Sequence, residues 1–590
     1  MEYFIGYLNF YKQPSLSVTL RYLILVFYFS KAVDRYLTTH DRGDVSMKQS
    51  YDQFSIHKLV LEMHKHTARH VLVLEADLRQ EDKVMIFGYC ERLRLLHNNV
   101  AAEMNRRYEQ LTRTKRYRAL LNLIEKATAK NQKKKVAELG IEIRRMREAY
   151  GITFASCSAY AQTLYNKYNV LAVFALTIAE NVWFGMERIL FGDGKHLMYK
   201  KRRNLPSIRG KQRQRGVVIK AVDGKLQFAL GTVKFNAIEK QDRFIQDELS
   251  NVIDYLEDHK NIDEACALLW KENGVIPDTF RPCFATLHPK IIRGKLRVFI
   301  HLNIEGKPMI KYDRDGNPRH ELGSGVVGVD IGTQTIAFTS KDGIGLANLA
   351  ERHNSVIGLE RKIHELQRSM DRSLFNLNPQ NYDENRVYKK GCHNWKFSKN
   401  YLKKRAVFTE LHRIAAINRK LAINEQVNYI RSISDTVVTE HSNAKALMKK
   451  AKKLTWNEEK GKYNRRKRFG RSIQKRCPGL MHACLKKKFE STGGAFVVVP
   501  SDYRASQYDC TSDEYIKKKL GQRLFKLSDG TEVQRDLYSS FLLWCINEEH
   551  TGIDKNLCDD RFNDFIERQG NLIEEIQSKH RVIMNSGIRV

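Results

Sequence analysis

The sequence has few cysteines and no paired ones. Its 590 residues include ten cysteines, which are scattered along the chain without a CxxC pair. Small secreted domains depend on denser cysteines that form disulfides, and that composition is absent here. We therefore expect reduced thiols and a cytoplasmic protein.

The sequence also lacks a long hydrophobic run. The most apolar stretch near the N-terminus, Tyr22–Phe29, lies between Arg21 and Lys31. It is far shorter than the roughly 20 residues of a membrane span. No small-residue cleavage pattern of a signal peptide follows it. We interpret it as a core strand or helix and expect no membrane partner.

Acidic residues are scarce relative to basic ones. Lys and Arg total 102 against 67 Asp and Glu, which gives a formal net charge of +35. Such an excess costs self-repulsion unless a polyanion neutralises it, so it favours a nucleic-acid partner. A chain of this length predicts two to four domains, each with its own core.

The first half of the chain reads as helices followed by a β-rich region. Residues 51–150 show helical apolar spacing with a basic opposite face, which includes the run Lys130–Lys135. That run fits a solvated helix face and a phosphate contact equally well. A basic segment, Lys200–Gly216, leads into a predicted hairpin with Asp223-Gly224 at its turn, and Lys295–Gly306 alternates as a further strand.

The second half, after Gly323, has an α/β pattern. An apolar strand carries Asp330 at its far end, and Asp342-Gly343 closes the hairpin that follows. A long charged helical region covers about 355–432. A basic helix-and-loop insertion then precedes another short apolar strand at 494–501.

Three carboxylates stand where a metal-dependent phosphodiesterase needs them. Asp330 and Glu440 each end an apolar strand, and Asp536 opens an apolar helix. Taken singly, a strand-end carboxylate needs only a buried partner, and an Asp at a helix start can be a cap. Acids that converge from different elements can instead hold two divalent ions about 4 Å apart, which clamp the attacking and leaving oxygens of a phosphodiester. The three acids in this order predict such a site.

From about Leu205 to its end, the chain resembles the TnpB proteins of insertion sequences and their descendants, the type V CRISPR effector nucleases. The three acids stand in that family's contexts, because Asp330 lies in a GxDxG-like strand end, Glu440 ends a later strand, and Asp536 belongs to an RD dipeptide before a helix. The other segments that carry the resemblance are LERKIHELQRSM at 359–370, HRIAAINRKLA around Asn418 and Arg419, ASQY at 505–508 and GQRLFKLSDGTEVQRDLYSSFLL around Arg523.

The resemblance implies a multidomain α+β protein of two lobes. These would comprise a β-barrel-like wedge domain, a helical recognition domain and an RNase H-like (RuvC) α/β nuclease domain. We predict the N-terminal part of the wedge domain at 1–50, the recognition domain at 51–195, the β-rich wedge domain at 196–322, the nuclease domain with helical and basic insertions at 323–500, a degenerate zinc-ribbon-like segment that binds target nucleic acid at 501–535, and the C-terminal part of the nuclease domain with a tail at 536–590.

The activity that the resemblance implies is RNA-guided cleavage of DNA next to a short motif, by two-metal-ion hydrolysis in one RuvC-like site. Asp330, Glu440 and Asp536 would be both catalytic residues and ligands of two Mg²⁺ or Mn²⁺ ions, with Glu440 also orienting the attacking water. The implied partners are a guide RNA and double- and single-stranded target DNA, with the protein a monomer or a homodimer.

Contacts to nucleic acid are predicted in three regions of the chain. The basic segment after residue 199 would contact guide or duplex, the basic insertion would form a mobile region over the catalytic cleft, and one arginine precedes the last acid. The predicted residues are Lys200, Lys201, Arg202, Arg203, Arg209, Lys211, Arg213, Arg215, Arg465, Arg466, Arg468 and Arg523. Trp456 and Tyr463 in the insertion could stack on unpaired bases or pack in a core.

The chain departs from the family in one segment. TnpB-like proteins usually carry a four-cysteine zinc ribbon before the last catalytic Asp, whereas here only Cys510 remains, and Lys526 and Asp529 stand about where the second pair of thiolates would be. Because a structural zinc site needs four ligands, we expect no structural zinc. Packing in place of metal could still hold the segment as a target-binding subdomain.

Three other functions use similar features. A guide-RNA-directed DNA-binding repressor that no longer cuts arises in the family by loss of active-site acids, and all three acids are present here. A DNA transposase can use the same metal-carboxylate fold but needs no guide RNA. A Holliday-junction resolvase shares that fold and is much smaller.

Overall fold

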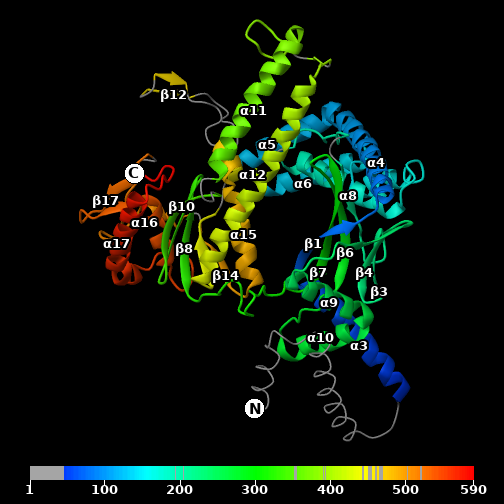
Figure 1. The fold of residues 1–590 in the computed structure, drawn as a ribbon, viewed down its shortest axis with the longest axis horizontal. Helices are drawn as coiled ribbons and strands as arrows, with labels where there is room; N and C mark the ends of the chain where they lie inside the picture. The colour runs from blue at the N-terminus through cyan, green and yellow to red at the C-terminus, as the bar shows by residue number, and fades with distance from the viewer. Residues whose placement is uncertain are drawn as a thin grey trace. The chain divides into compact units, whose positions relative to one another are not determined.

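The computed structural model describes residues 45–590, except for short segments at 193, 203–204, 351–354, 390, 393, 442–443, 449–454, 459–460, 464–469, 501 and 519–520. The predicted core element Tyr22–Phe29 and most of the predicted segment 1–50 lie outside the described residues. The chain divides into two compact units, Met1–Ile310 and Lys311–Val590 (Figure 1). The division falls before the boundary at 322–323 that the sequence pattern predicts.

The first unit contains a seven-stranded antiparallel sheet in the order β2-β6-β7-β1-β5-β4-β3. Its strands are β1 (Arg69–Asp77), β2 (Ile208–Arg209), β3 (Val217–Val222), β4 (Lys225–Leu230), β5 (Val233–Ala237), β6 (Pro282–Ile292) and β7 (Lys295–Glu305). Its helices are α3 (Val45–His66), α4 (Gln80–Arg113), α5 (Lys115–Ala129), α6 (Lys133–Ala149), α7 (Phe154–Gln162), α8 (Ala172–Phe191), α9 (Arg243–Glu257) and α10 (His259–Asn273).

Two strand predictions in this unit are confirmed. The β3–β4 hairpin turns at Asp223 and Gly224, whose φ angles of 48° and 67° are the left-handed conformation of a two-residue hairpin turn. The strand predicted at Lys295–Gly306 is β7, and its alternate residues, such as Ile300 and Leu302, are buried on one face.

The strand β1 lies inside the stretch predicted to be helical. The prediction of a helical domain over 51–195 is therefore wrong at Arg69–Asp77, which pairs with β7 on one side and β5 on the other. Leu72 and Leu74 are buried and Val73 between them is exposed, which is the alternation of a strand with one covered face. This short alternation of buried and exposed residues lies between two longer segments with helical spacing. It is therefore difficult to recognise in the sequence.

The sheet of the first unit curls on itself. The edge strand β3 lies against β6. The segment between β2 and β3 contacts β6 as well. In that segment the N–H of Gly210 donates to the carbonyl of Ala285 in β6 at 2.9 Å. A Cβ at Gly210 would stand 2.9 Å from the carbonyl oxygen of Ala285 and 3.3 Å from the nitrogen of Val217, so the close approach needs glycine.

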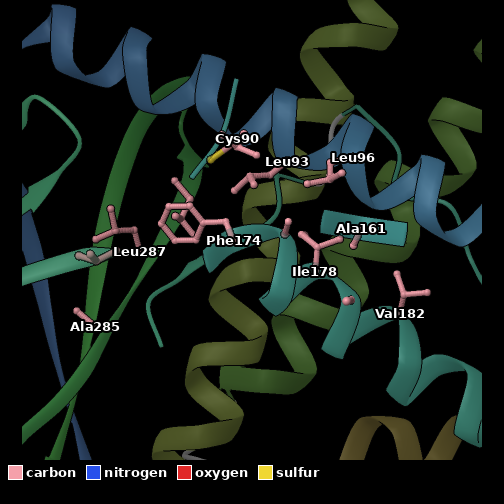
Figure 2. Close-up of a cluster of buried hydrophobic side chains, with 14 of the residues drawn as sticks. Cys90, Leu93, Leu96, Ala161, Phe174, Ile178, Val182, Ala285 and Leu287 are labelled. Atoms are coloured by element: carbon pink, nitrogen blue, oxygen red, sulfur yellow. The ribbon is translucent and has the colours of Figure 1, made fainter. Parts of the chain in front are cut away.

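Helices α4 and α8 cover the inner face of this sheet around Phe174 (Figure 2). The Phe174 ring meets the Tyr89 ring of α4 edge-on at 5.6 Å between centroids. The same buried cluster takes in Leu93 of α4, Ile178 of α8 and Leu287 of β6. Apolar burial of this extent is the main stabilising contribution to the unit.

A buried ion pair fastens α9 to the sheet. His70 of β1 faces two oxygens, because its Nε2 lies 3.0 Å from the Glu248 carboxylate and its Nδ1 lies 2.8 Å from the Gly306 carbonyl. Both ring nitrogens therefore act as donors, which describes an imidazolium. The other Glu248 oxygen accepts from the N–H of Met309 at 2.7 Å. The charge of Glu248, which is fully buried, is thus compensated.

The second unit contains a five-stranded mixed sheet in the order β10-β9-β8-β11-β14. The strands β8 (Val326–Ile331), β11 (Thr436–Thr439) and β14 (Ala495–Val498) are parallel, and β9 (Thr335–Ser340) runs antiparallel to β8 and to β10 (Ile344–Asn348). These are the strands and the hairpin that the second half of the sequence predicts.

Helices cover both faces of this sheet. On one face, α12 (Lys399–Ser432) and α15 (Pro478–Ser491) pack on side chains such as Val327 and Val437. On the other, α16 (Arg535–Trp544) packs on side chains such as Ala337 and Val438. The remaining elements are α11 (Ser355–Leu377), α13 (Ala444–Leu447), α14 (Gly470–Arg476), α17 (Lys555–Ser578), the 3-10 turns η1 (Pro379–Asn381) and η2 (Ala505–Gln507), and three small hairpins formed by β12 (Trp456–Asn457) with β13 (Lys462–Tyr463), β15 (Tyr508–Asp509) with β16 (Glu514–Tyr515), and β17 (Leu524–Lys526) with β18 (Glu532–Gln534).

None of the helices among the described residues has the length and apolar character needed to cross a membrane.

Candidate active site

Asp330 and Glu440 stand side by side at the carboxyl ends of two parallel strands. Thr439, the last residue of β11, is in register with Val329 of β8, so the residues that follow each of them occupy equivalent positions. Side chains alternate faces along a strand, and Val438 faces α16. Glu440 and Asp330 therefore lie on the α16 side of the sheet. The carboxyl edge of parallel strands is where open α/β sheets place their ligands.

Gly328 brings α16 against this pair of strands. A Cβ at Gly328 would lie 2.0 Å from the carbonyl oxygen of Ser540 and 2.4 Å from the nitrogen of Trp544, so the helix backbone rests directly on the strand backbone. Asp330 is two residues further along β8 on the same face, and Asp536 is one turn earlier on α16. The packing at Gly328 thus sets how Asp536 lies relative to Asp330.

Asp536 is buried and its carboxylate is held from two sides. The hydroxyl of Thr335 in β9 donates to one oxygen at 3.1 Å, and Arg523 donates to the other at 3.1 Å. Gln534, two residues before Asp536, caps α16. Its side-chain oxygen accepts a hydrogen bond from the N–H of Leu537 at 2.8 Å. These contacts fix the start of the helix that carries the acid.

The pKa of Asp330 responds to its burial and to the other two acids. Burial raises the pKa of Asp330 well above its usual 3.8, and the negative charges of Asp536 and Glu440 raise it further, while Arg535 and Arg523 oppose the shift. Glu440 is exposed at the surface of the site, yet loss of hydration raises its pKa, which Arg535 and a backbone hydrogen bond from Ala505 lower in part. Mutual repulsion between carboxylates is the signature of a place that a cation would stabilise.

The carboxylates of the three acids are suitable ligands for a divalent metal, but they are not arranged to hold one. Among the described residues, no three His, Cys, Asp or Glu side chains are placed to hold a metal ion. Asp536 is instead bonded to Arg523 and Thr335. The carboxylate oxygens of Asp330, Glu440 and Asp536 are the hard ligands that Mg²⁺ prefers. An ion held by all three acids would share the carboxylate of Asp536 with Arg523 and Thr335.

The basic residues predicted after residue 199 are spread over two places in the first unit. Lys200 is half-buried beside α4, where its carbonyl accepts from Arg94 and its N–H donates to Asn98, and burial lowers the pKa of its ammonium group. Lys201 and Arg202 beside it are exposed.

The other predicted basic residues of this segment lie near β6 and α8. Arg209 is stacked over the ring of Phe284 at 5.1 Å, and Lys211 pairs with Glu180 at 2.8 Å. Arg215 is exposed and Arg213 is half-buried. The segment is therefore not one continuous basic ridge.

Part of the predicted nucleic-acid contact set lies outside the described residues, namely Arg203, Arg465, Arg466 and Arg468. Trp456 and Tyr463 of the same insertion are described. They face each other across the β12–β13 hairpin, with ring centroids 5.0 Å apart, and are 54% and 63% exposed. The interpretation of this pair as core packing is wrong.

The segment predicted to resemble a zinc ribbon is built around Asp509. Its buried carboxylate accepts from the N–H and hydroxyl of Thr511 at 3.0 and 2.7 Å and from the N–H and hydroxyl of Ser528 at 2.9 Å each. Burial alone would raise the pKa of Asp509, but these hydrogen bonds outweigh it and lower the pKa below 3.8. The carboxylate joins the end of β15 to the turn after β17.

Several residues of the site have no motif that names them in advance. Thr335 and Gln534 hold Asp536 and its helix, and Gly328 sets the contact of that helix with β8. The available signals were indirect: a glycine in the apolar strand just before the acid, and a polar residue before the RD dipeptide.

Comparison with known proteins gives similarity to solved structures only. No protein-family model matches the chain, and no curated protein matches it significantly. A Cas12f ternary complex seen by cryo-EM matches at 13% identity with a TM-score of 0.24, covering 80% of this chain and 86% of that one. Crystal structures of the Cas12i1 R-loop complex after and before target DNA cleavage match at 8% identity with TM-scores of 0.24 and 0.23. They cover 89% and 82% of this chain and 66% and 61% of theirs. At these values the similarity by itself assigns neither fold nor activity to the chain.

Proposed function

We propose that the chain is an RNA-guided DNA endonuclease of the TnpB and type V effector kind, with one RuvC-like active site at Asp330, Glu440 and Asp536. The observation that supports the proposal is that Asp536 and Glu440 lie near enough to Asp330 for their charges to raise its pKa, in addition to the effect of burial. The first and the last of them are more than 200 residues apart in the sequence, yet β8 pairs in parallel with β11, and α16 packs on β8 at Gly328. The motifs around them and the net charge of +35 agree with a nuclease that binds nucleic acid.

Each acid has a distinct task in the proposed reaction. Asp330 and Asp536 would hold two Mg²⁺ or Mn²⁺ ions, and Glu440, the exposed member, would share in holding one and orient the attacking water. The ions, when bound, supply charge stabilisation for the phosphodiester oxygens and lower the pKa of water. Burial and the charges of the other two acids raise the pKa of Asp330, and a bound cation would favour its ionised form.

Arg523 has a proposed role beside the acids. Its bond to Asp536 neutralises that carboxylate while no cation is present. If Asp536 were to bind an ion, the guanidinium would be available for a phosphate, for which its fork of donors is well suited.

The bond between Arg523 and Asp536 also favours one second candidate. A protein that keeps all three acids but holds one of them on an arginine could bind guide and target without cutting. Such a guide-directed repressor would need the same nucleic-acid partners and would differ only in the chemical step.

The experiment is to express the protein with its own flanking DNA, purify it, sequence any RNA bound to it, and supply matching DNA with Mg²⁺. Asp330→Asn tests the site, and Glu548→Gln, an exposed acid of the same unit, is the matched control. A defined RNA, a cut by the parent and by Glu548→Gln, and no cut by Asp330→Asn support the proposal. A defined RNA with tight DNA binding and no cut by any of them means the repressor. Absence of bound RNA refutes the guided function.

A further inference from the structure

The connection between α11 and α12 is a folded structure at the far end of a long hairpin. The two helices lie side by side, and α12 runs over 34 residues, or about 50 Å, before it leads into β11 (Figure 1). The segment 378–398 therefore lies well away from the five-stranded sheet and its acids. We call the described residues of this segment, which leave out 390 and 393, the aromatic tip, together with the helix residues Phe375 and Tyr401 that pack on them.

Two buried asparagines give the aromatic tip its shape. Asn378 is fully buried, its amide nitrogen donates to the carbonyls of Leu374 and Lys396 at 2.9 Å, and its oxygen accepts from the N–H of Lys396 at 2.7 Å. Asn381 donates to the carbonyl of Asn394 at 2.8 Å. These bonds join the residues that follow α11 to the residues that precede α12, so the connection has a defined conformation.

A cluster of rings forms the interior of the aromatic tip. The buried Tyr382 ring meets Phe375 and Tyr388 with centroids 4.9 Å away in each case, and Trp395 at 5.9 Å. Phe397 is stacked on Tyr401 at 5.0 Å with an interplanar angle of 26°. Edge-to-face and offset arrangements of this kind hold rings in fixed orientations.

Two rings of the aromatic tip are exposed to solvent. Tyr388 is 53% exposed and Phe397 is 44% exposed, and Val387 beside Tyr388 is 57% exposed. Rings that are held rigidly and left exposed lose little conformational entropy when a partner stacks on them. The tip thus offers flat apolar faces ready for contact.

The exposed rings are surrounded by positive charge. Among the described residues, the exposed cations of the tip and of the first turns of α12 are Arg386, Lys389, Lys396, Lys399 and Lys403. The acids between them are Asp383, which uses one oxygen to accept the N–H of Val387, and Glu384. A surface that combines stacking faces with an excess of cations fits a partner that carries both flat bases and phosphates.

We propose that the aromatic tip binds single-stranded nucleic acid, with unpaired bases stacked on Tyr388 and Phe397 and phosphates bound by the neighbouring lysines. This rests on the proposed function, which it deepens by naming a contact for an unpaired strand far from the active site. A duplex buries its bases, so it would engage the lysines but not the rings. A second copy of this chain would bring the same positive charge to the surface and be repelled.

The test is fluorescence anisotropy of a labelled 20-nucleotide oligo(dT) strand and of a labelled 20-base-pair duplex, titrated with full-length protein carrying Asp330→Asn to prevent cleavage. The test variant combines Tyr388→Ala with Phe397→Ala. The control is Phe184→Ala, which removes a ring that is also 53% exposed but lies on α8 of the other unit. Loss of one stacked base weakens binding about 5- to 150-fold. We expect at least that loss for the single strand, a change below twofold for the duplex, and no change in the control.

Two further measurements keep the test decisive. The variant with Tyr388→Trp and Phe397→Trp has aromatic rings at both positions and should bind the single strand as well as the parent does. We would not expect this result if the two rings served only to stabilise the fold. Lys396→Gln should reduce the salt dependence of single-strand binding by about 0.7 in slope, the value for one phosphate.

The outcomes separate this inference from the proposed function. Failure of the parent to bind either nucleic acid overturns both. Binding by the parent that is unchanged in the double alanine variant, or reduced equally for single strand and duplex, overturns the tip inference alone. A double alanine variant that changes from dimer to monomer in light scattering without losing affinity assigns the rings to a second copy and also overturns it.

Discussion

A methyl group at Gly328 should disrupt the contact on which the candidate site depends. The added Cβ would lie 2.0 Å from the carbonyl oxygen of Ser540, 2.4 Å from the nitrogen of Trp544 and 2.8 Å from the carbonyl carbon of Leu543. All three are backbone atoms of α16, and the first two are the acceptor and donor positions of one helical turn. Because no side chain can rotate away, α16 must move by more than 1 Å or lose that turn.

The cost of Gly328→Ala should lie at the upper end of the range for overpacked cores, about 3 kcal/mol. For a unit of this size, about 1 kcal/mol lowers the melting temperature by roughly 2–4 °C, so we expect a fall of about 6–12 °C. The matched control is Gly358→Ala in α11, where a Cβ meets no atom within 4 Å. Replacement of an exposed helical glycine by alanine should stabilise the same unit by about 0.5–1 kcal/mol.

Differential scanning calorimetry distinguishes the two substitutions, because both lie in the second unit and should move the same transition in opposite directions. The reasoning also predicts that Gly328→Ala loses DNA cleavage at temperatures where it is still folded, since Asp536 moves with α16. A Gly328→Ala protein that melts within 1 °C of the parent and cuts at the parental rate would refute the contact between β8 and α16 as described.

Three charge effects give further predictions, each read by the melting temperature of the unit concerned. In EDTA at pH 8, Asp330→Asn should raise the melting temperature of the second unit by a few degrees, because it removes a carboxylate that is buried and that Asp536 and Glu440 repel. In Mg²⁺ without EDTA, the same variant should lose the stabilisation that the ion gives the parent. The raised pKa of Asp330 means that the folded state binds the extra proton, so the gain in EDTA should shrink as the pH falls toward 4. Asp509→Asn should cost roughly 3 kcal/mol near pH 7 and progressively less as the pH falls below about 4, because the lowered pKa of Asp509 makes its stabilising effect disappear there. Burial alone would lower the pKa of His70, but Glu248 raises it above 6.5, so the first unit should lose stability as the pH rises from 6 to 8.5, and Glu248→Gln should flatten that dependence.

Opposite results would contradict each of these assignments in turn. Asp330→Asn that destabilises the metal-free protein would mean that the acids do not repel one another. An Asp509→Asn protein as stable as the parent at pH 7 would mean that the four hydrogen bonds are not made. A first unit whose stability is flat between pH 6 and 8.5 would mean that His70 is neutral.

Strands and turns with a local signal were predictable from the sequence. Asp223-Gly224 predicts its hairpin because two consecutive left-handed residues are needed there, and the apolar runs ending at Asp330 and Glu440 predict strands because both are bounded by turn residues. The strand β1 was not predictable in the same way, because its partners β5 and β7 lie more than 150 residues away. Its pairing is decided by tertiary contacts that no local window contains.

The candidate site was predictable as a set of acids but not as a geometry. Motifs identified Asp330, Glu440 and Asp536, and the order of strands then brings the first two together. The bond from Arg523 to Asp536 was not foreseen, since the sequence interpretation assigned Arg523 to nucleic acid. Sequence spacing does not indicate whether the Arg523 side chain binds a phosphate or the carboxylate of Asp536, thirteen residues away.

The position of Arg523 itself depends on the end of the chain. A Cβ at Gly587, whose φ is +81°, would lie 2.8 Å from the Cβ of Arg523, and the carbonyl of Ser586 accepts from the amide of Gln534, which caps α16. Gly587 therefore packs against Arg523, and Ser586 contacts Gln534 at the start of α16. Both contacts help to position Asp536. Under the proposed function, a divalent ion would share this carboxylate with Arg523, so a change in this packing would alter metal binding without touching any acid. The position of the Asp536 carboxylate thus depends on Ser586 and Gly587 as well as on Arg523 and Thr335.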